Sequence, residues 1–249
     1  MILVTQAAYF LNQQLMHTLN QHNFNYLVAV DEPSQRSLLS SALRTHHWLD
    51  STELLDWLDK NKSEVEFFFH LDDDGSPDDL FRVLWKYGAA HQIPLIFSTT
   101  PSRTAWVEQQ SLAPFFWAGL SLANVFGPGD EGWVPQAYQS IIEGQSASNP
   151  SSEAQRIVYS LDVAAVCYFL LHHRVHSGMY TLDDVTTVTF EQVANWVERA
   201  SKNETYAERQ SAPPSALQAI GFNQPLFSAE MGVYDYVQNH LRGQTSYRK

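Results

Sequence analysis

The first 31 residues, MILVTQAAYFLNQQLMHTLNQHNFNYLVAVD, decide the fold class. Residues 2–5 (Ile-Leu-Val-Thr) form a short β-rich run, and residues 26–30 (Tyr-Leu-Val-Ala-Val) form an apolar run typical of a strand buried on both faces. Between these runs, apolar residues recur at helical spacing, at Phe10, Leu11, Leu15, Met16 and Leu19. A strand, a helix and a second strand within about thirty residues predict an opening βαβ unit.

The rest of the chain continues this alternation, with strands expected at 65–70, 93–98 and 119–125 and helices at 54–58 and 77–90. Strands that alternate with helices predict an α/β protein with a Rossmann-like, doubly wound parallel sheet. The later half is richer in helical patterns and predicts a small C-terminal α/β subdomain. We therefore expect a core over residues 1–130 and a subdomain over 131–249, with about 155–185 returning to the core.

Capping signals mark several helix starts. Asp50-Ser-Thr-Glu53 and Thr189-x-x-Gln192 are capping-box patterns, and Ser228 can cap a final helix. Residues 144–153 are rich in Gly, Ser, Asn and Pro, which predicts a loop.

Composition excludes several classes of function. The net charge of −12, with only 15 Lys and Arg in 249 residues, argues against binding to nucleic acid or to anionic membranes. The single cysteine, Cys167, lies in an apolar run and is expected to be a buried core residue. No signal peptide or long apolar window is present, so we expect a cytoplasmic protein without a membrane span.

A series of short motifs extends over the whole chain. They are the opening run 2–12, the acidic strand end at Asp31, Phe69-His70, Ile93-Pro-Leu-Ile-Phe-Ser98, Asn124-Val-Phe-Gly-Pro128, Val158-Tyr-Ser-Leu-Asp-Val-Ala164, Ser177-Gly-Met-Tyr180 and Ala219-Ile-Gly-Phe-Asn-Gln-Pro225. In this order they resemble the extended short-chain dehydrogenase/reductase superfamily, and in pattern most of all the ADP-heptose 6-epimerases among its nucleotide-sugar epimerases. The resemblance implies a Rossmann fold with a C-terminal subdomain of the substrate-binding type, NAD or NADP as cofactor, and a nucleotide-sugar substrate.

The cofactor-binding motif of that family is missing. The family's Gly-x-x-Gly-x-x-Gly lets the backbone turn tightly and approach a pyrophosphate. Gln6, Tyr9 and Asn12 occupy the three glycine positions here. Asp31 could contact a ribose hydroxyl, but without the loop it is expected to be only the polar end of its strand. We therefore expect no bound cofactor.

The catalytic motif is missing as well. The family uses Tyr-x-x-x-Lys, in which the lysine lowers the pKa of the phenol for proton transfer. None of the tyrosines in this chain is followed four residues later by lysine. Thr99 and Thr100 lie where the family has a catalytic Ser or Thr, and Asn124 and Gly127 match a motif beside its substrate. The latter pair is either a remnant of the pocket wall or an ordinary turn.

Two other polar groups carry weak metal signals. His172 and His176 are four residues apart on an expected helix, but no third ligand accompanies them, which favours an exposed helix end. Asp72-Asp-Asp-Gly75 resembles part of a calcium loop without its remaining ligands, which favours a solvated turn. We therefore expect no metal site.

Three functions remain open: a non-catalytic protein with a structural, interaction or regulatory role, a nucleotide or nucleotide-sugar binding module, and an active epimerase with a divergent site. A homo-oligomer or a protein partner is expected in the first case. Phe81 and Trp85 widen the apolar arc of the helix at 77–90 beyond what one sheet needs to cover. Either residues 105–117 or a second subunit could cover them, and a homodimer through this helix is the favoured prediction.

Overall fold

The computed structural model describes residues 1–72, 78–110, 114–145, 153–182, 187–206 and 210–245. The chain divides into two compact units. Unit 1 comprises Met1–Ser121 and Ala164–Thr181, and unit 2 comprises Leu122–Val163 and Leu182–Lys249. The boundary expected at residue 130 thus lies inside unit 2. Most of the loop expected at 144–153 falls outside the described residues.

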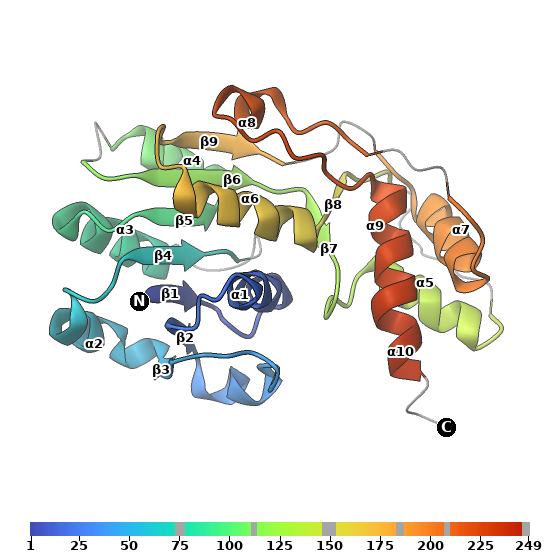
Figure 1. Ribbon diagram of the computed structural model, residues 1–249, viewed down its shortest axis with the longest axis horizontal. Helices are drawn as coiled ribbons and strands as arrows, with labels where there is room; N and C mark the ends of the chain where they lie inside the picture. The colour runs from blue at the N-terminus through green and yellow to red at the C-terminus, as the bar shows by residue number, and fades with distance from the viewer. Residues whose placement is uncertain (73–77, 111–113, 146–152, 183–186, 207–209, 246–249) are drawn as a thin grey trace. The chain divides into compact units, whose positions relative to one another are not determined.

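Unit 1 is built on a parallel sheet whose strand order is β3-β2-β1-β4-β5-β6-β9 (Figure 1). The strands are β1 (Ile2–Thr5), β2 (Leu27–Asp31), β3 (His47–Asp50), β4 (Phe67–His70), β5 (Leu95–Ser98), β6 (Trp117–Ser121) and β9 (Gly178–Thr181). From β1 the chain builds outward through β2 and β3, and it then returns to place β4 on the other side of β1. This reversal is the switch point of a doubly wound sheet and confirms the predicted fold class.

Helices cover both faces of this sheet. They are α1 (Phe10–Gln21), α2 (Leu54–Asn61), α3 (Asp79–His91), α4 (Pro101–Glu108) and α6 (Ser160–His172). Apolar side chains of α2, α3 and α4 pack into one core cluster with side chains of β1 to β5. On the other face lie α1 and α6 (Figure 1). His22, just after α1, stacks on Tyr168 of α6 with ring centroids 4.0 Å apart. Cys167 on α6 is buried, as expected.

The strands predicted from sequence are those in the middle of the sheet. Every residue of β1, β4 and β5 is buried, which requires the continuous apolar runs seen in the sequence. Strand β3 forms one edge, and Leu49 is its one fully buried residue, so its apolar signal was too weak to detect. The strand expected at 119–125 is in fact two strands, β6 and β7 (Asn124–Phe126).

Unit 2 combines a small parallel pair of strands with a helical core. Strand β7 pairs with β8 (Ile157–Tyr159). The helices are α5 (Trp133–Ile142), α7 (Phe190–Ser201), α8 (Ser215–Ala219), α9 (Ala229–Tyr236) with a π-helical turn (Val237–Leu241), and α10 (Arg242–Thr245). Side chains of α5, α7 and α9 share one apolar cluster. The capping box at Thr189 and Gln192 and the cap at Ser228 are confirmed.

Candidate functional site

The turn between β1 and α1 keeps a left-handed backbone without glycine. Gln6, at the first family glycine position, has φ +48°, a conformation that glycine adopts at no steric cost. In other residues this conformation costs about 1–2 kcal/mol. Tyr9, at the second position, has an extended backbone and precedes α1, which begins at Phe10. The path of the turn is therefore held by local interactions rather than by glycine's freedom.

Asn12, at the third glycine position, ties this turn to the neighbouring strand. Its buried side-chain amide donates to the carbonyl of Gln6 at 2.9 Å and to the carbonyl of Leu71, just after β4, at 2.6 Å. Its own oxygen, Oδ1, accepts no hydrogen bond among the described residues. A side chain thus fills the place where the family packs helix against strand through a bare glycine.

The carboxylate of Asp31 is bound to backbone on both oxygens. Oδ2 accepts from the amide of Ala8 at 2.9 Å, and Oδ1 accepts from the amide of Glu32 at 2.8 Å. The side chain of Gln13 adds bonds to the carbonyl of Ala8 at 2.8 Å and from the amide of Ser40 at 2.9 Å. Asp31 therefore stabilises the β1–α1 turn, as expected for a polar strand end.

A buried network of charged groups lies at the carboxyl ends of β4 and β5. Arg103, on α4, has no exposed surface, and both of its terminal nitrogens donate to the carboxylate of Asp72, Nη2 to Oδ2 at 2.6 Å. Its Nε donates to Asp78 Oδ1 at 2.8 Å. Ser98, the last residue of β5, donates from its hydroxyl to Asp72 Oδ1 at 2.6 Å. The guanidinium of Arg103 thus offsets much of the negative charge of the Asp72 and Asp78 carboxylates inside unit 1.

The pairing with Arg103 decides the ionisation of Asp72. Burial by itself would raise the pKa of this carboxyl. The hydrogen bonds from Arg103 and Ser98, together with the nearby ring of His70, outweigh burial and hold the pKa of Asp72 below its ordinary value. The carboxylate is therefore ionised at neutral pH, although its residue is only 6% exposed.

His70 extends this network to β1. Its Nδ1 lies 2.7 Å from the hydroxyl of Thr5, and its Nε2 lies 3.3 Å from Asp72 Oδ2, outside hydrogen-bond geometry. The hydroxyl of Thr5 also donates to the carbonyl of Phe69 at 3.2 Å. The order hydroxyl, imidazole, carboxylate is that of a nucleophilic triad. Thr5 and His70 are completely buried, however, so no substrate can reach them, and the group is structural.

This buried group occupies the functionally expected position of the fold. Open α/β sheets bind ligands outside the carboxyl ends of their strands, at the point where the strand order reverses. Here that point lies between β1 and β4. Thr5, at the end of β1, contacts His70 at the end of β4, and Asn12 of α1 donates to the carbonyl that follows β4. Sequence analysis interpreted Asp72 as part of a solvated turn and overlooked Arg103. The prediction for Asp72 was wrong because a cation thirty-one residues further along the chain buries it.

The two threonines at the end of β5 have backbone roles. Thr100 caps α4: its hydroxyl accepts from the amide of Arg103 at 3.1 Å. The hydroxyl of Thr99 donates to the carbonyl of Leu120 at 3.3 Å. Helix α4, residues Pro101–Glu108 (PSRTAWVE), contains neither tyrosine nor lysine. A short helix without the tyrosine and lysine of the Tyr-x-x-x-Lys motif therefore follows β5.

The pocket-wall candidates Asn124 and Gly127 lie in unit 2. Asn124 is exposed, and its side-chain amide donates to the carbonyl of Arg156 at 3.2 Å. Gly127 has φ +152°, and a Cβ there would lie 2.0 Å from the hydroxyl oxygen of Ser160. Both positions therefore act in the β7–β8 connection, and glycine is required at 127 by close packing.

The aromatic residues predicted to form an interface are covered within the chain. Phe81 is 0% and Trp85 3% exposed. The ring of Trp85 lies 5.7 Å from that of Trp106 and 5.2 Å from that of Phe115, both from the 105–117 segment. The premise of an uncovered patch on this helix was wrong, because the rings of Trp106 and Phe115 pack against α3.

The two histidines considered as a metal pair do not share a helix. Helix α6 ends at His172, and His176 follows in the exposed connection to β9. No cluster of three or more metal-ligating side chains occurs among the residues described. Within the same residues, no helix has the length and apolarity needed to span a membrane.

Comparison with known proteins supports the sequence resemblance over the whole chain. No family model matches. The curated ADP-L-glycero-D-manno-heptose-6-epimerase of Fusobacterium nucleatum is 23% identical over 331 aligned positions, which include 99% of this chain and all of the relative. The alignment is longer than this chain of 249 residues, so segments of the relative have no counterpart here.

Solved structures share the fold from end to end. The UDP-N-acetylglucosamine 4-epimerase of Methanobrevibacter ruminantium, in complex with UDP-N-acetylmuramic acid, matches with TM-score 0.73 and 15% identity over 99% of this chain and 98% of its own. The UDP-glucose 4-epimerase of Thermotoga maritima, with UDP-glucose, matches with TM-score 0.72 and 17% identity over 98% and 99%. The dTDP-glucose 4,6-dehydratase of Bacillus anthracis, in complex with NAD, matches with TM-score 0.73 and 13% identity over 98% and 97%. Sequence likeness over the full length and the shared fold agree: the chain is similar to the NAD-dependent epimerases and dehydratases of the extended short-chain dehydrogenase/reductase superfamily.

Proposed function

We propose that this chain is a non-catalytic member of its superfamily, with a structural, interaction or regulatory role. One observation carries the proposal. At the switch point between β1 and β4, the polar groups bond to one another, with Asn12 bridging the two strand ends and Arg103 neutralising Asp72 beside them. Apart from Asn12 Oδ1 and His70 Nε2, which have no hydrogen-bond partner among the described residues, these buried groups are already bonded within the protein and have little capacity left for a ligand.

The residues at the β1–α1 turn do not fit a nicotinamide dinucleotide. A pyrophosphate needs bare backbone and free amides at the start of the helix. Here the amide of Ala8 already donates to Asp31, whose negative charge would repel a phosphate. Asn12 and Tyr9 add side chains where the family has none. NAD and NADP are therefore expected to bind weakly or not at all.

The reaction also lacks its acid–base pair. Epimerisation through the family's mechanism needs a phenol whose pKa is lowered by a neighbouring lysine. No such pair exists in the sequence, and the remnant hydroxyl of Thr100 caps a helix. A hydroxyl without a base nearby does not abstract a proton at neutral pH.

A protein partner or a second copy of the chain fits this role better than a small substrate. Self-association through Phe81 and Trp85 has lost its basis, because both side chains are buried within the chain. Any partner must use another surface. Light scattering after size exclusion measures the oligomeric state, and a cytoplasmic location stays a prediction that cell fractionation tests.

Turnover is the direct test of this function. Purified protein is incubated with ADP-heptose and UDP-hexoses in the presence of NAD or NADP, with the Fusobacterium nucleatum relative as positive control, and products are separated. We expect no product above background. Product that disappears in Thr100→Ala would overturn the proposal. Thermal stabilisation by a nucleotide sugar without any product would instead favour a binding module.

A further inference from the structure

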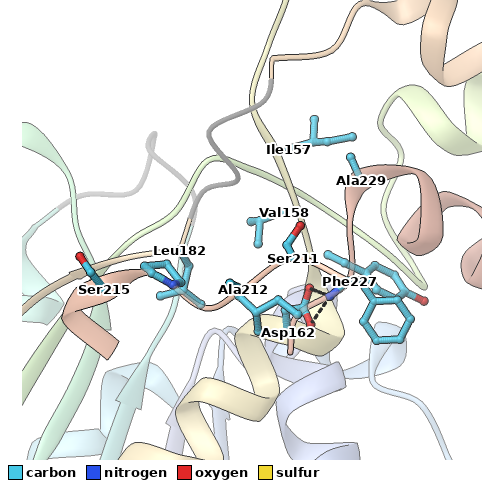
Figure 2. Close-up of a pocket in the computed structure, with 12 residues that line it drawn as sticks. Ile157, Val158, Asp162, Leu182, Ser211, Ala212, Ser215, Phe227 and Ala229 are labelled. Carbon is cyan, nitrogen blue, oxygen red and sulfur yellow. Dashed lines mark hydrogen bonds between the residues drawn. The ribbon is translucent and has the colours of Figure 1, made fainter. Parts of the chain in front are cut away.

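A pocket of about 290 Å³ lies within unit 2, and none of the residues at the β1–β4 switch point lines it (Figure 2). It is formed by β8, the first turn of α6, and two stretches at 211–215 and 226–229 that bridge through Ser211 and Leu226. Most of its lining is apolar, including Ile157, Val158 and Leu182. Its volume is near the lower end of the range of about 300–1,000 Å³ for small-molecule sites, so only a small ligand fits.

Asp162 is the one described acidic residue that lines this pocket. Asp162 is 5% exposed, and both carboxylate oxygens accept from the amide of Phe227, at 3.2 and 3.1 Å (Figure 2). A carboxylate has about four acceptor positions, so one shared donor leaves most of them unused. Burial raises the pKa of Asp162 to about 7, and the bond from Phe227 lowers it only in part. Among the described residues, no lysine or arginine pairs with this carboxylate.

The surroundings favour a positively charged ligand. No lysine or arginine is among the described residues that line the pocket. The chain carries a net charge of −12, which attracts cations and repels anions such as phosphates. An ammonium group would supply the missing donors and charge at Asp162, while a short hydrocarbon chain would cover the aliphatic wall.

We propose that this pocket binds a small organic cation, a primary ammonium on a short aliphatic chain, with its nitrogen at the carboxylate of Asp162. None of the residues at the β1–β4 switch point lines this pocket. The test of this proposal is therefore independent of the test of the proposed function. Because the ammonium needs the ionised carboxylate, its binding becomes tighter as pH rises through the titration of Asp162. The other titratable group that lines the pocket is Tyr159, whose hydroxyl donates to Asp235 at 2.5 Å. Burial raises the pKa of Tyr159, so it stays neutral over this range.

The test compares n-butylammonium with n-butanol, a neutral molecule of the same shape. Binding is followed by NMR titration and by thermal shift at pH 8. We expect the ammonium to bind at least tenfold more tightly than the alcohol, and Asp162→Asn to abolish this preference. Asp130→Asn is the matched control, because it removes a buried carboxylate of the same unit that does not line the pocket. This control should leave the preference intact.

The wild-type protein provides a second readout that needs no variant. Its affinity for n-butylammonium should fall at least fivefold between pH 8 and pH 5.5, while its affinity for n-butanol stays constant. Ala212→Leu, which narrows the pocket, should weaken both ligands. Equal affinity for the two ligands, no binding of either, or an unchanged ammonium preference in Asp162→Asn would overturn the proposal.

Discussion

Asp72 in unit 1 and Asp162 in unit 2 are equally buried but have pKa values shifted in opposite directions. Asp72 is 6% exposed, and Asp162 is 5% exposed. Asp72 faces Arg103 and has a lowered pKa, whereas Asp162 accepts only a backbone amide among its described partners and has a pKa of about 7. Burial alone therefore does not decide ionisation, because the partner does. At the carboxyl ends of β4 and β5 in unit 1, Arg103 offsets the charge of Asp72, whereas Asp162 in unit 2 has no cation beside it among the residues described.

This difference gives the two units opposite responses to pH. The pKa of Asp72 is lower in the folded protein than its value of 3.8 in the unfolded chain. The ionised Asp72 therefore stabilises unit 1 above about pH 3.8, and this stabilisation is lost as the pH falls further. Folding favours the protonated form of Asp162, so its contribution weakens as pH rises from 3.8 to about 7. Asp130, whose pKa burial raises to about 6, acts in the same direction as Asp162.

The largest expected effect comes from removing the cation of unit 1. Arg103→Met leaves the carboxylates of Asp72 and Asp78 without their partner, and losing one partner of a buried pair costs about 3–5 kcal/mol. Urea denaturation at pH 7 measures the loss. The matched control is Arg199→Met, which removes a half-exposed partner of Glu230 and should cost less than about 1 kcal/mol. Equal losses in the two variants would show that the buried network does not stabilise unit 1.

Neutralising the acid of unit 2 should have the opposite sign. Asp162→Asn keeps an acceptor for the amide of Phe227 but removes the buried charge. Because the pKa rises from 3.8 to about 7, the variant should be more stable than wild type at pH 8.5 by roughly 4 kcal/mol at most. The gain should vanish near pH 4. Urea denaturation across this range checks it, and a difference that does not change with pH would contradict the assignment.

A smaller effect tests the bridge between β1 and β4. Asn12→Ala removes the donor to two carbonyls, those of Gln6 and Leu71, and should cost about 1–3 kcal/mol. Asn124→Ala, which removes one exposed amide from unit 2, should stay within about 0.5 kcal/mol of wild type. Thermal denaturation distinguishes the two. A neutral Asn12→Ala would mean that the turn is held without this side chain.

Much of the fold could be predicted from sequence, because its central strands are buried on both faces and read as apolar runs. Strand β3 was missed, since an edge strand with a single fully buried residue has no such run. The loss of the glycines was visible directly at Gln6, Tyr9 and Asn12. The buried ion pair at the carboxyl ends of β4 and β5 could not be predicted, because Asp72 and Arg103 are far apart in sequence and only the fold brings them together. The aromatic interface prediction failed for the same reason.

Dinucleotide binding tests the central claim most directly. Isothermal titration calorimetry with NAD and NADP, combined with mass spectrometry of the denatured protein, measures both added and co-purified cofactor. We predict no released dinucleotide and no saturable binding at millimolar concentration. The reason is that Asn12, Asp31 and Arg103 already bond to neighbouring groups of the protein at this end of the sheet. Micromolar binding of either dinucleotide, or its release from the purified protein, would contradict it.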